Sequence, residues 1–287
     1  MNRTDSLRQL NDAALGLSAA GRRLAGRRIL VVGAGQRACD DPDAIGNGRA
    51  ISLLLARQAA MLVCADRDAA SAAATVARIQ AEGGSASALV CDIAAADAVP
   101  PMLDRAAAVH GGLDGIVVNA GISLGHSLAD ETAEGWDAVL AVNLRAAMLI
   151  ARDGLPLLEP GGSMVFVSSL ASIHPGGRNP AYEASKAGLA ALVRAAALEG
   201  QVRGIRVNAV APGLIDTPMG RAASARNAAR AARPLPFGRQ GTAWELAHAV
   251  MFLIGDEASY VNALTLFVDG GLSQQVVLAE ASASTAR

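Results

Sequence analysis

Residues 163–189, SMVFVSSLASIHPGGRNPAYEASKAGL, predict a strand, a loop and a helix in succession. The apolar run 164–167 is typical of a buried strand, and the loop after it is rich in glycine and proline. Residues 181–200 are dense in alanine and leucine and contain no proline, which predicts a helix. Tyr182 and Lys186 stand four residues apart in that helix, so their side chains share one face.

Tyr182 and Lys186 have the spacing of a useful acid–base pair. A free tyrosine titrates near pH 10, so its use as a base near neutral pH requires a pKa shift of about 3 units, or roughly 4 kcal/mol. Two unit charges about 4 Å apart in an effective dielectric of about 20 interact by about 4 kcal/mol. A lysine ammonium at that distance could therefore produce a pKa shift of the required size. The alternative is an exposed helix face with a partly buried ring.

With Ser169, thirteen residues before the tyrosine (182 − 169 = 13), the pair resembles the active site of the short-chain dehydrogenases/reductases, in the compact branch of that family. The resemblance implies that Tyr182 exchanges a proton with the substrate oxygen, that Ser169 hydrogen-bonds that oxygen, and that Lys186 holds the nicotinamide ribose and lowers the tyrosine pKa. Asn143, in a helix expected over 133–152, would bend that helix and complete a catalytic tetrad. Its alternative is a helical asparagine bonded to its own backbone.

A strand expected over residues 29–32 leads into a glycine motif that is interrupted. The chain first turns at Gly33 and Gly35, where dinucleotide-binding folds bring their backbone to the pyrophosphate. An acidic run with a proline follows and would break a helix. We therefore treat residues 36–45 as an insertion that splits the family's TGxxxGxG motif. The second half of the motif follows as Gly46, Asn47 and Gly48.

The position of Asp66 favours this split. An acidic residue that binds the adenosine ribose is expected about 20 residues beyond the fingerprint. Asp66 lies 66 − 48 = 18 residues beyond Gly48 but 66 − 35 = 31 beyond Gly35. A carboxylate there accepts a hydrogen bond from a free 2′-hydroxyl and repels a 2′-phosphate, which favours NAD over NADP. The alternatives are that Asp66 is an N-terminal helix acid and that Arg67 binds a phosphate. We expect the acids of the insertion to point into water, because inward they would repel the pyrophosphate.

Strands and helices alternate along the rest of the chain, which predicts a single-domain Rossmann-type α/β fold with a doubly wound parallel sheet of about seven strands. We place the catalytic domain at residues 27–273, after an N-terminal extension over 1–26 that is either mobile or docked, and before a tail over 274–287. The resemblance implies more cofactor-binding residues near strand ends. They are Asp92 and Ile93 beside the adenine, Asn119, Ala120 and Gly121 behind the ribose, and Pro212, Gly213, Ile215 and Thr217 at the nicotinamide.

The composition argues against several classes of protein. The 287 residues carry a formal net charge of −1, which gives no reason to expect nucleic acid as a partner. No apolar run reaches the length of a membrane span, and the first residues lack a compact apolar core before a cleavage site, so the cytoplasm is the expected location. The three cysteines have no CxxC spacing and the four histidines are scattered, which predicts reduced thiols and no metal site.

Residues 219–233 are rich in arginine and predict a helical lid. Arg226, Arg230 and Arg233 fall at i, i+4 and i+7, so one continuous helix would align them in a stripe. Guanidinium groups suit carboxylates and phosphates, and the stripe would then recruit an anionic substrate such as a carboxylic acid or the phosphopantetheine of an acyl carrier. The alternative is the solvated face of a mobile lid.

The expected helices 133–152 and 181–200 carry many small side chains, which permit close helix packing. The resemblance implies that these helices pair across a two-fold axis, and we expect a homotetramer. Burial of the same faces inside the monomer is the alternative.

The sequence as a whole predicts an NAD(P)-dependent oxidoreductase that interconverts a secondary alcohol and a ketone, with NAD as the expected cofactor. One alternative is a 3-oxoacyl thioester reductase of the same family, acting on acyl carrier protein or CoA and normally using NADPH. Another is a cofactor-binding protein without turnover. The substrate itself is not identified, although one group of side chains is expected to line its pocket. These are Ser123, Leu124, His126, His174, Arg178 and Leu214.

Overall fold

The computed structural model describes residues 11–17, 19–41, 43–174, 176 and 179–274. It contains a seven-stranded sheet in the order β3-β2-β1-β4-β5-β6-β9, in which every neighbouring pair is parallel. The strands are β1 (Arg28–Val32), β2 (Met61–Asp66), β3 (Ser85–Val90), β4 (Leu113–Val118), β5 (Leu158–Val167), β6 (Arg206–Pro212) and β9 (Thr265–Val268). Two short strands, β7 (Ile215–Asp216) and β8 (Gly241–Thr242), pair separately. The predicted single-domain Rossmann-type fold is confirmed.

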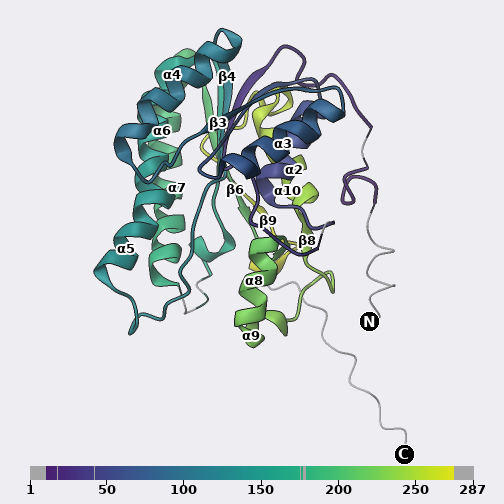
Figure 1. The fold of residues 1–287 in the computed structure, drawn as a ribbon. Coiled ribbons are helices and arrows are strands. Elements are labelled where there is room, and N and C mark those ends of the chain that lie inside the picture. Colours follow the sequence, from purple (N-terminus) through teal and green to yellow (C-terminus); the bar gives the residue numbers. More distant parts are fainter. Residues whose placement is uncertain (1–10, 18, 42, 175, 177–178, 275–287) are drawn as a thin grey trace, which may run out of the picture.

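Helices cover both faces of this sheet (Figure 1). The α-helices of the described residues are α2 (Asn47–Arg57), α3 (Ala69–Ala81), α4 (Val99–His110), α5 (Ala133–Leu140), α6 (Ala146–Gly154), α7 (Pro180–Gly200), α8 (Pro218–Arg226), α9 (Ala228–Ala231) and α10 (Ala243–Ile254), of which α8 and α9 lie away from the sheet. Leu30 and Val32 of β1 pack with α4, α6 and α7, whereas Ile29 and Val31 pack with α2 and α10. This alternation follows from the two-residue period of a strand, and a sheet buried on both faces needs apolar residues at every position.

Since all seven strands are parallel, the chain leaves each of them at the same edge of the sheet. The strand order reverses between β1 and β4, and in open α/β sheets the crevice at such a point receives the ligand. The segments that follow β1, β4, β5 and β6 therefore converge there. These segments carry the glycine motif, the Asn119–Gly121 turn, the serine pair and the Pro212–Thr217 segment.

The helix expected over residues 133–152 is present in two parts. A π-helical turn, Ala141–Arg145, separates α5 from α6, and Asn143 lies inside this turn. A π turn inserts one extra residue into the helix and displaces the side chains that follow. The expected irregularity at Asn143 is therefore confirmed.

The lid, residues 218–233, is not one continuous helix. α8 ends at Arg226, Asn227 takes an extended conformation (φ −138°, ψ 97°), and α9 begins at Ala228. The side chain of Asn227 accepts a hydrogen bond from the backbone N–H of Arg230 at 3.2 Å and so caps the second helix. Asparagine favours this capping position over a helix interior. The predicted stripe of three aligned arginines is therefore wrong.

The described part of the N-terminal extension is docked on the domain. Leu24 is buried, the backbone oxygen of Gly16 accepts a hydrogen bond from Arg57 of α2, and that of Ala14 accepts one from Thr242. Residues 1–10 of the extension and 275–287 of the tail lie outside the described residues. Within the described ranges, no helix is both long and apolar enough to cross a membrane.

Candidate active site

Three side chains that the sequence singles out meet beyond the end of β5. Tyr182 and Lys186 lie one turn apart on α7, with the lysine Nζ 5.7 Å from the centre of the tyrosine ring. Lys186 is 3% exposed and donates a hydrogen bond of 2.9 Å to the backbone oxygen of Val167. Ser169 lies two residues beyond the end of β5, and its side chain interacts with Tyr182, where it opposes the rise of the tyrosine pKa. The predicted convergence of serine, tyrosine and lysine is therefore present in the structure.

The protonation of this group differs from the sequence expectation. Burial raises the pKa of Tyr182, and the hydrogen bond from Ser169 and the charge of Arg230 oppose that rise only in part. Burial also lowers the pKa of Lys186 to about 8. The lysine amine is directed to Val167 and is not among the groups that lower the tyrosine pKa. In this arrangement Tyr182 is a protonated acid at neutral pH, opposite to the direction that the sequence predicts.

Asn143 holds the turn behind the lysine. Its Oδ1 accepts a hydrogen bond of 2.8 Å from the N–H of Ile122, and its Nδ2 donates to the oxygen of Ile122 and to Ser185 Oγ, each at 3.0 Å. Asn143 is thus neither bonded to its own helix nor bonded directly to Lys186. A Cβ atom on Gly121 would lie 3.3 Å from Lys186 Nζ and 3.4 Å from Asn143 Oδ1, so the Asn119–Gly121 turn covers both groups.

Ser185 is a member of this network that the sequence analysis misses. It is fully buried, accepts from Asn143 and donates a hydrogen bond of 2.7 Å to the backbone oxygen of Tyr182. The sequence signal that could have indicated Ser185 is its position directly before Lys186, on the helix face toward the π turn. Ser168 is similar, because its buried hydroxyl donates to the backbone oxygen of Lys186 at 3.1 Å. Both serines anchor α7 and do not face the reacting group.

The glycine motif forms a narrow cradle at the start of α2. Gly33 has φ +78°, and a Cβ atom there would lie 2.6 Å from the nitrogen of Ala120. A Cβ atom on Gly48 would lie 1.9 Å from the oxygen of Gly33, so only glycine allows this approach. No side chain caps the N-terminus of α2, and its first turn contains no acid. These features fit the pyrophosphate of a dinucleotide, which binds at free N–H groups of a helix start.

The insertion is a closed loop whose two ends are tied together by one side chain. Gln36 donates to the oxygen of Ala44 at 3.3 Å and accepts from the N–H of Gly46 at 3.0 Å. The α2 helix begins only after this loop, at Asn47, which confirms the split motif.

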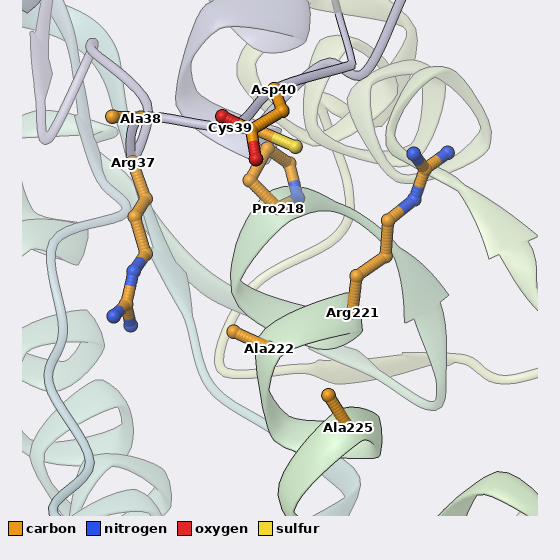
Figure 2. A pocket seen from close by; sticks show the side chains of 8 residues that line it. All are labelled: Arg37, Ala38, Cys39, Asp40, Pro218, Arg221, Ala222 and Ala225. Atoms are coloured by element: carbon orange, nitrogen blue, oxygen red, sulfur yellow. The ribbon is translucent and has the colours of Figure 1, made fainter.

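The acids of the insertion are exposed or partly exposed, in line with the expectation that they face water. Asp40 and Asp43 are exposed, but Asp41 forms an ion pair with Arg221 of α8, which also pairs with Asp216. The guanidinium group explains this, since it offsets the charges of both carboxylates. Arg37, Cys39 and Asp40 line an open cavity of about 450 Å³ together with Pro218 and residues of α8. Figure 2 shows these side chains from close by. The insertion thus contacts the lid.

Asp66 lies beside the glycine cradle and is not the cap of a helix. Its Oδ2 accepts a hydrogen bond of 2.9 Å from the N–H of Gly35, and its Oδ1 accepts from the N–H of Asp68. Asp68, not Asp66, caps α3. This removes the alternative of an N-terminal helix acid for Asp66. Arg67, the alternative phosphate ligand, is exposed.

The other predicted cofactor residues lie near the same edge of the sheet. Asp92 is exposed and Ile93 buried after β3, and Asn119 donates a hydrogen bond of 2.8 Å to the oxygen of Gly33. Gly213 leaves β6 against Asp269, where a Cβ atom would lie 2.7 Å from Asp269 Cβ. Thr217 is 7% exposed and caps α8 through Gly220, in the segment that holds Pro212 and Ile215.

The expected pocket-lining residues are partly occupied with one another. Ser123 donates to Asn179 Oδ1 at 2.8 Å, His126 contacts Glu131 at 3.1 Å, and His174 contacts the oxygen of Ser273 at 3.0 Å. Leu214 is buried and Leu124 is 42% exposed. Arg178 lies outside the described residues. No cluster of three metal-ligating side chains occurs in the part of the chain that the structure describes.

Comparison with known proteins gives consistent results. Residues 44–273 match the family model described as enoyl-(acyl carrier protein) reductase. The 3-oxoacyl-(acyl-carrier-protein) reductase FabG of Thermotoga maritima is 34% identical over 254 residues, which cover 87% of this chain and 99% of that protein. The cis-4-hydroxycyclohexanecarboxylate dehydrogenase of Sinomonas cyclohexanicum is 38% identical, over 79% of this chain and 92% of that protein.

A solved structure extends the comparison to the fold. The short-chain dehydrogenase of Burkholderia cenocepacia, in complex with NADP, superimposes with a TM-score of 0.76 at 35% identity, covering 87% of this chain and 98% of that one. Fold, glycine cradle and sequence relatives therefore agree: the chain belongs to the short-chain dehydrogenase/reductase family and is an NAD(P)-dependent oxidoreductase that interconverts alcohols and ketones.

Proposed function

We propose that Ser169, Tyr182, Lys186 and Asn143 form the catalytic group of this oxidoreductase. The observation that carries the proposal is the convergence of Ser169 and Tyr182 with the buried amine of Lys186, which lies one turn from Tyr182 on α7. A bound nicotinamide supplies or accepts the hydride. Ser169 holds the substrate oxygen and Tyr182 exchanges the proton with it. Asn143 acts as a positioning residue, because its hydrogen bonds go to Ile122 and Ser185.

The raised pKa of Tyr182 suits proton donation to a ketone at neutral pH. Oxidation of an alcohol needs the tyrosinate and is therefore favoured at alkaline pH. A cofactor bound beside Lys186 would change the surroundings of Tyr182 and Lys186. Both side chains are proposed to hold its ribose as well.

The test is turnover of a panel of cyclic alcohols, steroids, sugars and acyl thioesters, followed by NADH absorbance, with two tyrosine variants. Tyr182→Phe loses the proton donor, so kcat falls by about a thousandfold or more, while NADH binding stays within about twofold. The matched control is Tyr260→Phe, because Tyr260 is fully exposed, and this variant keeps wild-type activity. Substantial turnover by Tyr182→Phe rules out the assignment.

A second candidate is reduction of a 3-oxoacyl thioester. The FabG relative, matched over 99% of its own length, favours it. The test compares kcat/KM for a 3-oxoacyl thioester with kcat/KM for each free ketone. A value at least ten times higher for the thioester, or roughly 1.4 kcal/mol or more in transition-state binding, selects this candidate over the first.

We propose NAD as the preferred cofactor, on the position of Asp66. Its carboxylate stands beside Gly35 at the glycine cradle, where it accepts from a ribose hydroxyl and repels an added phosphate. Asp66→Ala removes both effects and narrows the ratio of kcat/KM for NAD over NADP by about tenfold. Faster turnover of wild type with NADP contradicts the proposal, and the Burkholderia cenocepacia relative does bind NADP.

We propose a homotetramer that uses the outer face of α7. An exposed, apolar stripe at helical spacing runs along this helix: Ala184, Ala187, Ala191, Ala195 and Leu198. Small side chains permit the close approach of a second helix. Light scattering of wild type and of Ala191→Arg tests it. The expected result is a tetramer that the arginine dissociates, and a monomeric wild type contradicts it.

We further propose that the catalytic unit spans residues 27–273 and that the protein works in the cytoplasm. Its three cysteines are free in the structure, as is usual in a reducing compartment.

A further inference from the structure

Arg230 differs from the other arginines that are withdrawn from water. It is half-buried on α9, yet within the described residues its guanidinium has no hydrogen bond and no ion pair. Every other buried or half-buried arginine of the described chain has a partner for its side chain. These are Arg27, Arg28, Arg49, Arg57, Arg206, Arg221 and Arg239.

The Nε atom of Arg230 is enclosed and has no acceptor. An unsatisfied donor on a charged group that has left water is unfavourable, so the surrounding structure must hold it there. It is held through the backbone, because Asn227 accepts from the Arg230 N–H and fixes the start of α9. A second charge of the lid is unfavourable too, since Arg233 repels the guanidinium.

The unpaired guanidinium lies within electrostatic range of the catalytic group. Its charge acts on the Tyr182 hydroxyl, and the tyrosine acts on it in return. Arg226 and Arg233, the other members of the expected stripe, are exposed and lack this connection. Among the three, only Arg230 is both withdrawn from water and coupled by its charge to Tyr182.

We propose that Arg230 binds a carboxylate of the substrate, so that the preferred substrates are hydroxy- and oxo-carboxylates whose acid group lies on the lid side of the reacting carbon. The proposal rests on the proposed function, since it places the reacting oxygen at Tyr182. One guanidinium matches the single charge and the two oxygens of a carboxylate.

The first experiment measures binding, independently of turnover. The full chain saturated with NADH is titrated calorimetrically with cyclohexanecarboxylate and with its neutral counterpart, cyclohexanecarboxamide. Wild type binds the carboxylate at least about tenfold more tightly, as expected for a charge-assisted hydrogen bond. Arg230→Met removes that preference and Arg230→Lys restores part of it. Arg226→Met, the same change at an exposed position of the lid, keeps the preference. Equal or undetectable binding of the two probes by wild type overturns the proposal.

The second experiment measures turnover of 4-oxocyclohexanecarboxylate and 4-oxocyclohexanecarboxamide. Arg230→Met raises KM for the carboxylate by about tenfold or more and leaves that for the carboxamide within about threefold. Equal effects on both ketones contradict the proposal. The two proposals fail separately. If Tyr182→Phe still reduces a ketone at a substantial rate while the carboxylate binds through Arg230, the catalytic assignment fails and the inference about Arg230 stands. If ketones are reduced without any preference for the carboxylate that depends on Arg230, the inference about Arg230 fails and the catalytic assignment stands.

Discussion

The polar groups around α7 and those between the insertion and the lid are held in different ways. Around α7 they are buried: Asn143, Ser185 and Lys186 are each at most 3% exposed and bond to one another or to backbone. Between the insertion and the lid they are ion pairs with about two-fifths of each side chain exposed, as for Asp41 and Arg221. Buried hydrogen bonds resist opening, whereas an exposed pair contributes about 1 kcal/mol or less. The residues proposed for proton transfer thus lie in the rigid region, and the contact between the insertion and the lid is the labile one.

Lys186→Met tests the rigid region and has the largest expected effect. Activity falls by about a thousandfold, because the variant loses the amine that lies beside Tyr182 and that we propose holds the ribose. Stability of the cofactor-free protein rises at pH 7. Burial lowers the lysine pKa from 10.5 to about 8, so the charged amine destabilises the wild-type fold by about 3 kcal/mol. The variant is relieved of this cost but loses the hydrogen bond to Val167, which stabilises the wild type by about 1 kcal/mol. The free energy of unfolding of the variant should therefore be about 2 kcal/mol higher.

The gain should depend on pH with a definite sign. Below the folded pKa of about 8, Lys186 is charged in both states and its burial destabilises the fold in full. As pH rises from about 8 to 10.5, the unfolded chain binds the proton that the folded chain has released, so wild-type stability increases. Urea unfolding at pH 7 and 9.5 should show the gap between variant and wild type closing. A gap that is constant with pH contradicts the burial of a charged amine.

Arg221→Met tests the labile region. It removes the pairs with both Asp41 and Asp216, so the insertion and the lid separate more readily. Two exposed ion pairs together contribute roughly 1 kcal/mol, which corresponds to about a fivefold change in rate. Release of NADH, measured by stopped-flow fluorescence, should therefore be about fivefold faster. Arg226→Met changes the same residue type at the end of the same helix and should release NADH at the wild-type rate. Equal rates for all three proteins would show that this contact does not retain the cofactor.

Asn227→Ala has the smallest expected effect, confined to the lid. Loss of the cap at α9 costs about 0.5 to 1 kcal/mol locally. Hydrogen exchange at the amides of Arg230 and Ala231 should speed up by about threefold, and global unfolding should change by less than about 0.5 kcal/mol. A large drop in global stability would place the lid inside the cooperative core and weaken the contrast between the two regions.

The sequence predicts the rigid region well because its signals are local. Apolar runs define the strands, with β1 beginning one residue before the expected 29–32 and β5 beginning earlier than expected, at Leu158. Helical spacing puts Tyr182 and Lys186 on one face, and the distance to Asp66 places the start of α2 after the insertion. Each of these depends on residues that are neighbours in the chain.

The sequence does not predict the labile region, because its contacts join distant residues. Asp41 meets Arg221 across 180 positions, and nothing near either residue indicates the other. Arginine spacing in the lid suggested one helix, yet the capping preference of Asn227 broke it. The approach of Arg230 to Tyr182 and the rise of the tyrosine pKa both come from burial, which only the packed structure reveals.

Lys186 is the single lysine of a chain whose other 24 basic residues (25 − 1) are arginines. Arginine stays protonated in proteins, so this chain has one long basic side chain that can lose its proton. Labelling with nitrogen-15 lysine would therefore give one side-chain resonance, from the centre of the active site and free of background. That isotopic reporter could follow the amine's protonation as cofactor and substrate bind, with the native sequence intact.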